Sequence, residues 1–169
     1  MALPRKLKNM NLFDEGESFH GQVDEVTLPK LSRKMEEYRA GGMNAPVEID
    51  HGQELMTAEV VCGGIMESIL KQWGSMKADG IGLRFAGSYQ REDTGLEEQV
   101  EVVMRGRWKE VDMAGAKVGD DTKHKHMATL AYYRLSIAGQ EIIEIDVLGM
   151  VERVNGVDLM AERRKNIGL

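Results

Sequence analysis

The last third of the chain, residues 129–169, constrains the fold most strongly. Apolar and polar residues alternate through Thr129–Ile137 and again through Glu141–Val151, with an Ala-Gly pair between the two runs. Alternation with a period of two is the pattern of a strand that buries one face. Asn155-Gly156 then marks a turn, and a short charged segment follows. The pattern predicts a β-hairpin that leads into a short C-terminal helix, with no catalytic residues along it.

The rest of the chain is also predicted to consist mainly of short strands and turns. The segments with strand-like patterns are Phe19–Thr27, Val47–Asp50, Leu55–Cys62, Ile81–Tyr89 and Val100–Val111. One further helix is expected after Gly63-Gly64, where the apolar residues at helical spacing are Ile65, Met66, Ile69, Leu70 and Trp73. We therefore expect a mainly β fold, a single domain over residues 1–169 built as a β-sandwich or barrel with one flanking helix and a short C-terminal helix.

Periodicity alone leaves one segment, Leu28–Tyr38, open between helix and strand. Its apolar residues fall at helical spacing, whereas Pro29 disfavours a helix that runs in from the preceding residues. The following Arg39–Pro46 contains two glycines, an asparagine and a proline, and is expected to be a loop.

Composition narrows the function classes. The 169 residues carry a formal net charge of −6, which opposes electrostatic capture of nucleic acid. Aromatic residues make up only 5%, too few for a base-stacking surface. No apolar run approaches the roughly 18 residues that a membrane span needs, so no membrane contact is expected. A single cysteine, Cys62, excludes an internal disulfide, and a buried structural thiol is expected there.

Two motifs suggest chemistry, and neither is complete. Asp93-Thr94-Gly95 is the triplet of aspartic proteases, but the polar residues before it cannot supply the dry, apolar surroundings that such carboxylates need. His124 and His126 share one face of a strand, yet no third ligand is evident and the lysines beside them would repel a metal ion. We expect a solvated turn at the first motif and a solvated strand end at the second. The sequence therefore predicts no enzyme, no catalytic or metal-binding residues and no cofactor.

Several segments together resemble one family, the major tail tube proteins of contractile-tailed bacteriophages and of R-type pyocins. The similarity is strongest in Leu83–Gly95 and Met104–Arg107, and its order and spacing extend to both ends of the chain. The other matching segments are Pro4–Lys8, Val26–Leu31, Arg33–Arg39, Gly42–Asn44, Cys62–Gly64, Glu144–Asp146, Glu152–Asp158 and Asn166–Leu169. The clearest departures are the Ala138-Gly139 turn and the histidines of Lys123–His126.

The resemblance implies a structural virion protein that forms six-membered rings stacked into a hollow tube inside a contractile sheath. It also implies that Leu28–Tyr38 is an extended strand. The implied partners are further copies of the chain, the tail sheath protein, the tube initiator or baseplate and tail terminator proteins, and a tape measure protein in the lumen. DNA would pass through without specific binding, and the tail would be assembled in the host cytoplasm. The alternative is the ring-forming tube protein of type VI secretion, which is similar in architecture.

Self-association through exposed strand edges is the expected mechanism. The residues expected at contacts between subunits or rings are Leu3, Arg5, Tyr38, Arg39, Met43, Asn44, Val47 and Ile49, from the N-terminal arm and the segment around Tyr38–Ile49. The residues expected to give one wall of the tube its negative charge are Glu97, Glu98, Asp120 and Asp121.

Overall fold

The computed structural model describes residues 2–169, which form twelve β-strands and two short helices. In chain order these are β1 (Arg5–Asp14), β2 (Glu17–Ser18), β3 (Val23–Thr27), β4 (Arg33–Tyr38), β5 (Val47–Gln53), β6 (Met56–Cys62), α1 (Glu67–Lys71), β7 (Ile81–Arg91), β8 (Glu97–Asp112), β9 (His124–Ile137), β10 (Gln140–Asp146), β11 (Val151–Val154), β12 (Val157–Asp158) and α2 (Ala161–Asn166). The expectation of a mainly β fold with two short helices is confirmed.

Strand β9 organises the main sheet because it is paired along both edges. One edge pairs with β8 along nearly its whole length, from Asp112 opposite Lys125 to Val100 opposite Ile137. The other edge changes partner: β6 pairs with the first half of β9 and β10 with the second half. All of these pairings are antiparallel. The sheet therefore forks at the middle of β9, near Ala131, whose carbonyl accepts a hydrogen bond from the Val147 amide at 2.9 Å.

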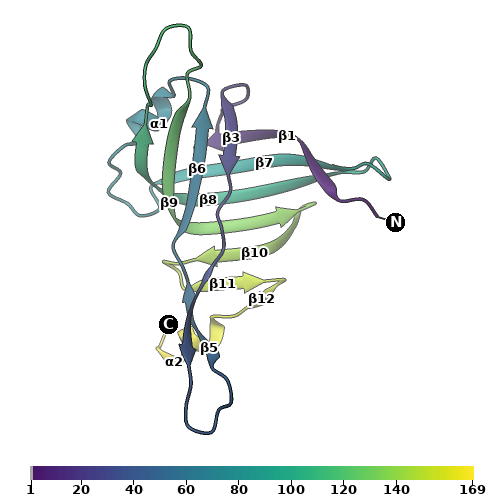
Figure 1. Cartoon of the computed structure of the whole chain (residues 1–169), viewed down its shortest axis with the longest axis vertical. Coiled ribbons are helices and arrows are strands. Elements are labelled where there is room, and N and C mark those ends of the chain that lie inside the picture. Colours follow the sequence, from purple (N-terminus) through teal and green to yellow (C-terminus); the bar gives the residue numbers. More distant parts are fainter. Residues whose placement is uncertain (1) are drawn as a thin grey trace.

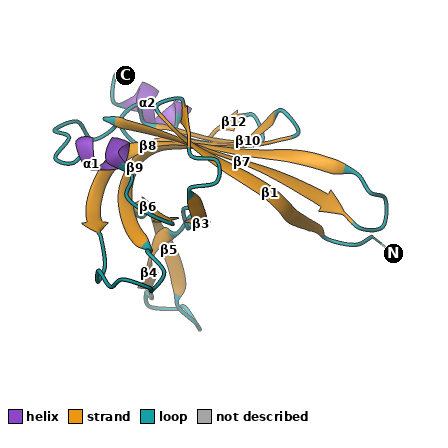
Figure 2. Cartoon of the chain, turned by 90° about the horizontal axis from the view of Figure 1, so that it is seen from above, coloured by secondary structure: helices purple, strands orange, loops and turns teal. Residues whose placement is uncertain are grey.

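The fork produces two layers with a core between them. One branch continues from β10 to β11 and β12, while β8 leads to β7, β1 and β2 on the other side. The second branch, β6 with β3, crosses over this sheet, as Figures 1 and 2 show from two directions. The buried side chains that meet between the layers include Leu12, Val60, Phe85, Val102 and Met104. Sheets that cross at a large angle turn their corners through bent or bulged strands, and β8 has register shifts at Arg105/Gly106 and Trp108/Glu110.

Gln72, half-buried at the end of α1, links this helix to two buried side chains of the core. The Gln72 side-chain amide donates to both oxygens of the buried Asp14 carboxylate at 2.9 Å. The Trp108 indole N–H donates to the Gln72 side-chain oxygen at 2.8 Å. Gln72 thus connects the last residue of β1 to the second half of β8. These hydrogen bonds hold the end of α1 against the core.

The C-terminal hairpin is confirmed in part. Strands β9 and β10 meet at Ala138 and Gly139, whose φ angles of 50° and 79° are those of a tight hairpin turn. The prediction of one continuous strand over Glu141–Val151 is wrong, because β10 ends at Asp146 and a turn separates it from β11. The Asp146 carboxylate accepts a hydrogen bond from the Gly149 amide at 2.9 Å, which stabilises that turn.

The helix after Gly63-Gly64 is shorter than its apolar pattern suggests. Only Glu67–Lys71 are helical, and Met66 and Ile69 are buried, whereas Ile65 and Trp73 are 67% and 56% exposed. The segment lies at the end of the core, so only the middle of its apolar face meets the layers. The strand that the resemblance implied for Leu28–Tyr38 is confirmed only from Arg33 onward, as β4, and residues 28–32 are neither helix nor strand.

The prediction of a solvated strand end at Lys123–His126 is wrong. His124 and His126 are 5% and 0% exposed, while Lys123 and Lys125 point to solvent. His126 lies opposite Val60 on β6 and Val111 on β8, with the Trp108 ring edge-on at a centroid distance of 6.0 Å. Burial lowers the pKa of His126 and so keeps its imidazole neutral; nearby His124 lowers the pKa further and Asp112 raises it. Cys62 is buried as predicted, and burial raises the pKa of its thiol to about 11.

Gly106 provides a test of the bend in β8. A Cβ atom at this position would overlap the carbonyl of Thr129 on β9, so the two strands come close only because residue 106 has no side chain. We expect Gly106→Ala to lower the free energy of unfolding by at least about 1–3 kcal/mol, measured by chemical denaturation. Gly115→Ala is the control, because a Cβ there meets open space. Equal stability of the two variants would contradict the close approach.

His126 provides a test of the pH dependence of stability. An imidazole whose pKa is lowered on folding is protonated more readily in the unfolded chain, so stability should fall as the pH drops below the unfolded value of about 6.5. Neither ring nitrogen has a hydrogen-bond partner within residues 2–169. We expect His126→Leu to raise the free energy of unfolding at pH 7 by about 1 kcal/mol and to reduce its loss between pH 7 and 5. His20→Leu, at an exposed site, should keep the wild-type pH profile; the same profile in the His126 variant would refute the assignment.

Candidate assembly surfaces

Strands β4 and β5 form a two-stranded sheet of their own that projects from the body of the molecule (Figures 1 and 2). Their residues are mostly exposed, and they pair only with each other. The alternating pattern of both strands places one set of side chains on each side of the hairpin. A projecting hairpin of this kind presents both its faces and both its outer edges to whatever lies beside it.

One face of the hairpin carries three large apolar side chains toward its tip and the charged Glu36 toward its base, where Lys34 and His51 contact Glu36 at 3.4 and 3.3 Å. Tyr38 lies directly opposite Val47, and Ile49 lies opposite Glu36, so Tyr38, Val47 and Ile49 share a face. These three side chains are 52%, 50% and 43% exposed. We call this set the hairpin apolar face. Large apolar side chains gathered on an exposed strand pair are typical of an interaction surface.

The loop at the tip of the hairpin is held by its own contacts. Met43 donates its amide hydrogen to the Ala40 carbonyl at 3.2 Å, and its own carbonyl accepts from the Arg39 guanidinium at 3.3 Å. Asn44 is exposed beside them. Six of the eight residues predicted at subunit contacts thus lie together on this hairpin, namely Tyr38, Arg39, Met43, Asn44, Val47 and Ile49.

The other two, Leu3 and Arg5, lie at a separate place. Strand β1 begins at Arg5 and pairs with β7, so the segment expected to be a reaching arm is docked on its own chain in this structure. The Leu3 amide donates to the Asp93 carboxylate at 3.3 Å, and Arg5 forms an ion pair with Glu98 at 3.0 Å. Within the described residues, β1 has no strand paired along its other edge from Arg5 to Asn11. That edge is free to accept a strand.

The four predicted wall residues do not form one patch. Glu97 and Glu98 begin β8, whereas Asp120 and Asp121 lie in the loop between β8 and β9, at a distant end of the molecule in both overall views (Figures 1 and 2). The loop pair also has local partners, since Asp120 and Asp121 contact Lys117 and Lys123 at 3.2 and 3.5 Å. Within one copy of the chain, the two acidic pairs therefore belong to separate surfaces.

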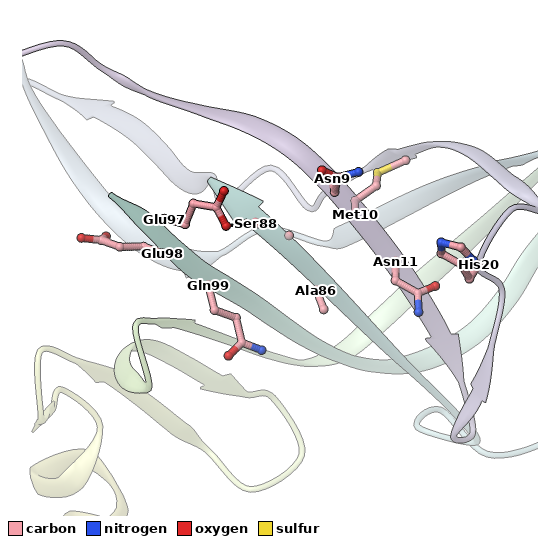
Figure 3. Close-up of a pocket in the computed structure, with 10 residues that line it drawn as sticks. Asn9, Met10, Asn11, His20, Ala86, Ser88, Glu97, Glu98 and Gln99 are labelled. Atoms are coloured by element: carbon pink, nitrogen blue, oxygen red, sulfur yellow. Dashed lines mark hydrogen bonds between the residues drawn. The ribbon is translucent and has the colours of Figure 1, made fainter. Parts of the chain in front are cut away.

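A hollow of about 510 Å³ lies on the outer side of β1, β7 and β8, beside Glu97 and Glu98 (Figure 3). Half of its ten lining residues carry amide or carboxylate side chains, Asn9, Asn11 and Gln99 among them, and Met10, Ala86 and Gly87 add apolar surface. Ser88 Oγ is 3.5 Å from the Glu97 carboxylate, too far for the close contact that activates a nucleophile. The hollow is an open surface depression of mixed polarity, and this serine is not paired closely with a base.

The aspartic-protease triplet is a turn, as predicted. Asp93-Thr94-Gly95 connects β7 to β8, and the Asp93 carboxylate binds the Arg91 guanidinium at 2.7 and 3.1 Å. Hydrogen bonding to Arg91 is the main reason that the pKa of Asp93 is lowered. The residue is paired with a cation and not with a second carboxylate. Among residues 2–169, no group of three or more His, Cys, Asp or Glu side chains is arranged to hold a metal ion, and no helix is long and apolar enough to cross a membrane.

Comparison with known proteins identifies the family to which the chain belongs. The model of the family "Phage tail tube protein FII" matches residues 4–168. The chain belongs to this family. The tail tube protein of Escherichia phage P2 is 48% identical over 172 residues, covering all of both chains. The major tail tube protein of Serratia phage KSP20 is 37% identical and is covered over 95% of its length, with 96% of this chain.

Solved structures agree on the fold. A chain in the cryo-EM structure of the sheath–tube terminator of an extracellular contractile injection system matches with a TM-score of 0.60 at 10% identity, covering 79% of this chain and 96% of that one. A chain in the extended sheath–tube complex of the same kind of system matches with the same TM-score and covers 91% of its own length. This tail tube protein is thus a structural component of virions or tail-like particles, and its family supports the prediction that it is not an enzyme.

Proposed function

We propose that the tail tube protein polymerises into six-membered rings that stack as the inner tube of a contractile tail and form the conduit for genome delivery. The observation that carries this proposal is the hairpin apolar face, which projects from a body whose own core is complete. A repeated contact between unlike surfaces closes into a ring or continues as a filament. Membership of the tail tube family supports such an assembly.

Two surfaces are suited to different parts of that assembly. The hairpin reaches away from the body and can dock its apolar face on a neighbouring copy. The free edge of β1 can accept a strand from another copy through main-chain hydrogen bonds. A stable protein interface buries more than about 1,000 Å² in total, more than three side chains provide. Both surfaces are therefore used in the proposed tube.

The remaining partners follow from the position of a tube inside a tail. The tail sheath protein surrounds the outer wall, baseplate or initiator and terminator proteins contact the two ends, and a tape measure protein fills the lumen before DNA passes. Assembly takes place in the host cytoplasm. Relatives at 48% and 37% identity are phage tail proteins, which favours a phage tail over the tube of type VI secretion.

The hairpin apolar face gives the sharpest test. Tyr38→Ser combined with Ile49→Ser should abolish rings and tubes seen by negative-stain electron microscopy, because the substitutions remove the exposed apolar contact area. The thermal unfolding midpoint should change by less than about 2 °C, since neither side chain packs in the core.

Met35→Ser is the matched control. Met35 is 45% exposed on the same hairpin, but it lies opposite Asp50 and so faces the other way. We expect this variant to assemble like the wild type. Normal tubes from the Tyr38/Ile49 double variant would contradict the proposed docking of the hairpin.

The two acidic pairs give a second test, because they lie at separate places. Glu97→Gln with Glu98→Gln and Asp120→Asn with Asp121→Asn each remove two negative charges. If only one pair faces the tube lumen, only one variant should slow genome ejection, since negative walls repel DNA phosphates. Tube assembly, sheath assembly and ejection should be measured separately for each. Unchanged behaviour of both variants in all three assays would remove these residues from the mechanism.

A further inference from the structure

The hairpin of β4 and β5 has very few fixed points on the body. The chain enters it through Ser32 and leaves it through Glu54, whose amide donates to the Ser32 carbonyl at 2.8 Å. Isolated two-stranded hairpins are only marginally stable in water. The strand register also shifts between Arg33 and Met35, and Gly52 has a φ angle of 106°, so the base of the hairpin is irregular. Pairing within the hairpin therefore does not by itself set its direction.

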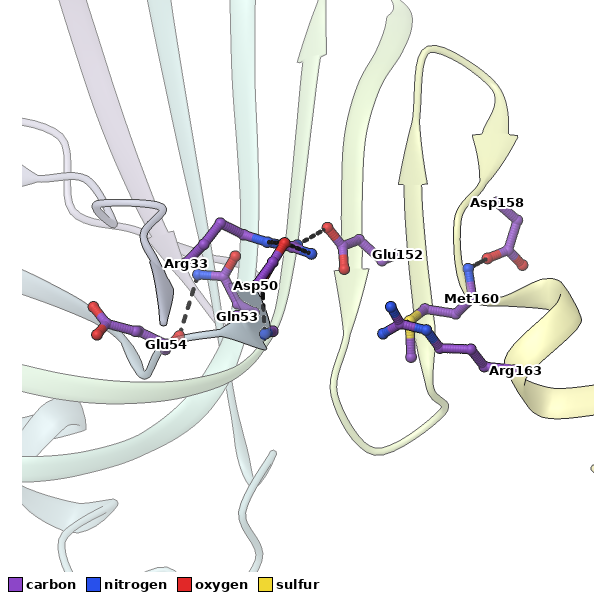
Figure 4. A network of polar contacts seen from close by, with 9 residues as sticks. Arg33, Asp50, Gln53, Glu54, Glu152, Asp158, Met160 and Arg163 are labelled. Carbon is purple, nitrogen blue, oxygen red and sulfur yellow. Dashed lines mark hydrogen bonds and ion pairs between the residues drawn. The ribbon is translucent and has the colours of Figure 1, made fainter. Parts of the chain in front are cut away.

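Arg33 supplies a contact that does. Its guanidinium binds the Asp50 carboxylate across the hairpin at 2.8 Å through Nε and Nη2, and its Nη1 forms an ion pair with Glu152 on β11 (Figure 4). The second oxygen of Asp50 accepts a hydrogen bond from the Gly52 amide at 2.8 Å. One side chain thus connects both strands of the hairpin base to the C-terminal part of the sheet, 119 residues away in sequence.

The Arg33–Glu152 contact has no substitute nearby. Within the described chain, it is the only hydrogen bond or ion pair that joins residues 33–53 to anything beyond the hairpin base. A hollow of about 250 Å³ separates the hairpin residues His51, Gly52 and Gln53 from the turn and helix around Met150 and Arg163. Arg33 is therefore the polar tether between the hairpin base and the body, which face each other across this hollow.

The Arg33–Glu152 pair is partly shielded from water and can fix the direction of the hairpin. The Glu152 side chain is only 15% exposed and that of Arg33 is 31% exposed, so water screens the pair less than an ordinary surface pair. Arginine presents its donors in a rigid planar fork, and engaging two carboxylates at once therefore fixes their relative direction as well as their distance.

We propose that Arg33 is a positioning residue that holds the hairpin at one angle to the body through Glu152, and so presents the hairpin apolar face ready-aligned to the next copy. The consequence for assembly rests on the function proposed above. A segment that points in many directions binds more weakly, because only the fraction of molecules in the binding-competent direction can dock. Holding the segment in that direction removes this loss of apparent affinity. Loss of the tether should weaken assembly while leaving the body folded.

Glu152→Gln is the cleanest variant, because it weakens the tether from the body side by replacing the carboxylate with a neutral and weaker acceptor, and it leaves every hairpin residue in place. The concentration at which half of the protein assembles should rise about fivefold, the factor that corresponds to about 1 kcal/mol at 25 °C. Sedimentation of assembled material measures this concentration. Glu141→Gln is the matched control: it removes a carboxylate from the adjacent strand β10 that pairs with Arg153 at 3.6 Å and does not contact the hairpin.

The direction of the hairpin is measured separately, in the unassembled full-length protein. Spin labels on Gly41→Cys at the hairpin tip and Lys109→Cys on β8 report their separation by pulsed electron paramagnetic resonance, and Cys62 is too buried to be labelled. Glu152→Gln should broaden the distance distribution, and Glu141→Gln should not. Arg33→Ala should broaden it at least as much, since it also removes the contact with Asp50, and adding Glu152→Gln to Arg33→Ala should cause no further broadening because Glu152 has already lost its partner.

Each result bears on one of the two proposals. An unchanged distribution in Glu152→Gln, or equal broadening in Glu141→Gln, overturns the role of the tether. Broadening without a change in assembly overturns its contribution to docking. If the wild type forms no rings or tubes while the distribution still broadens in Glu152→Gln, the polymerisation proposed above fails and the positioning role of Arg33 stands.

Discussion

The pairing of β9 on both edges is the interaction on which the rest of the molecule depends. Its first half is held between β8 and β6, and its second half between β8 and β10. This single change of partner divides one sheet into two layers and creates the space that the core fills. It also requires β8 to bend beside it, which is possible because Gly106 has no side chain to meet the Thr129 carbonyl. A change at this point would disturb both layers together.

The surfaces suited to assembly lie away from that core. The hairpin apolar face and the free edge of β1 consist of groups that the body does not need for its own stability. Separation of this kind suits a subunit that must fold before it polymerises, because contacts between copies can form and break without disturbing the fold. As a consequence, the exposed hairpin has few contacts that fix its direction. In the proposal above, the Asp50–Arg33–Glu152 network fixes the angle between the hairpin and the body.

Local sequence patterns predicted the positions of strands and turns better than they predicted where a strand ends or which side chains are buried. The alternation in Thr129–Ile137 and the turn after it correctly located β9 and the hairpin, since the pattern depends only on neighbouring residues. The same alternation could not show that Val147–Met150 would leave the strand, because that turn depends on the Asp146 carboxylate and on β9 beside it. His124 and His126 were placed in solvent on the strength of their lysine neighbours, yet alternation sends the lysines outward and the imidazoles into the core.

The sequence by itself determined a mainly β chain and, through its resemblance, its membership of the tail tube family. Strand periodicity, turn residues and motif order are local properties, so they can be recognised without knowing which strands meet. The tertiary structure alone decided that β9 serves two layers, that the acidic pairs lie at separate ends, and that Arg33 reaches Glu152. These three features depend on contacts between residues far apart in the chain. The alternation of apolar and polar residues cannot reveal such contacts, because it is the same whichever strand lies alongside.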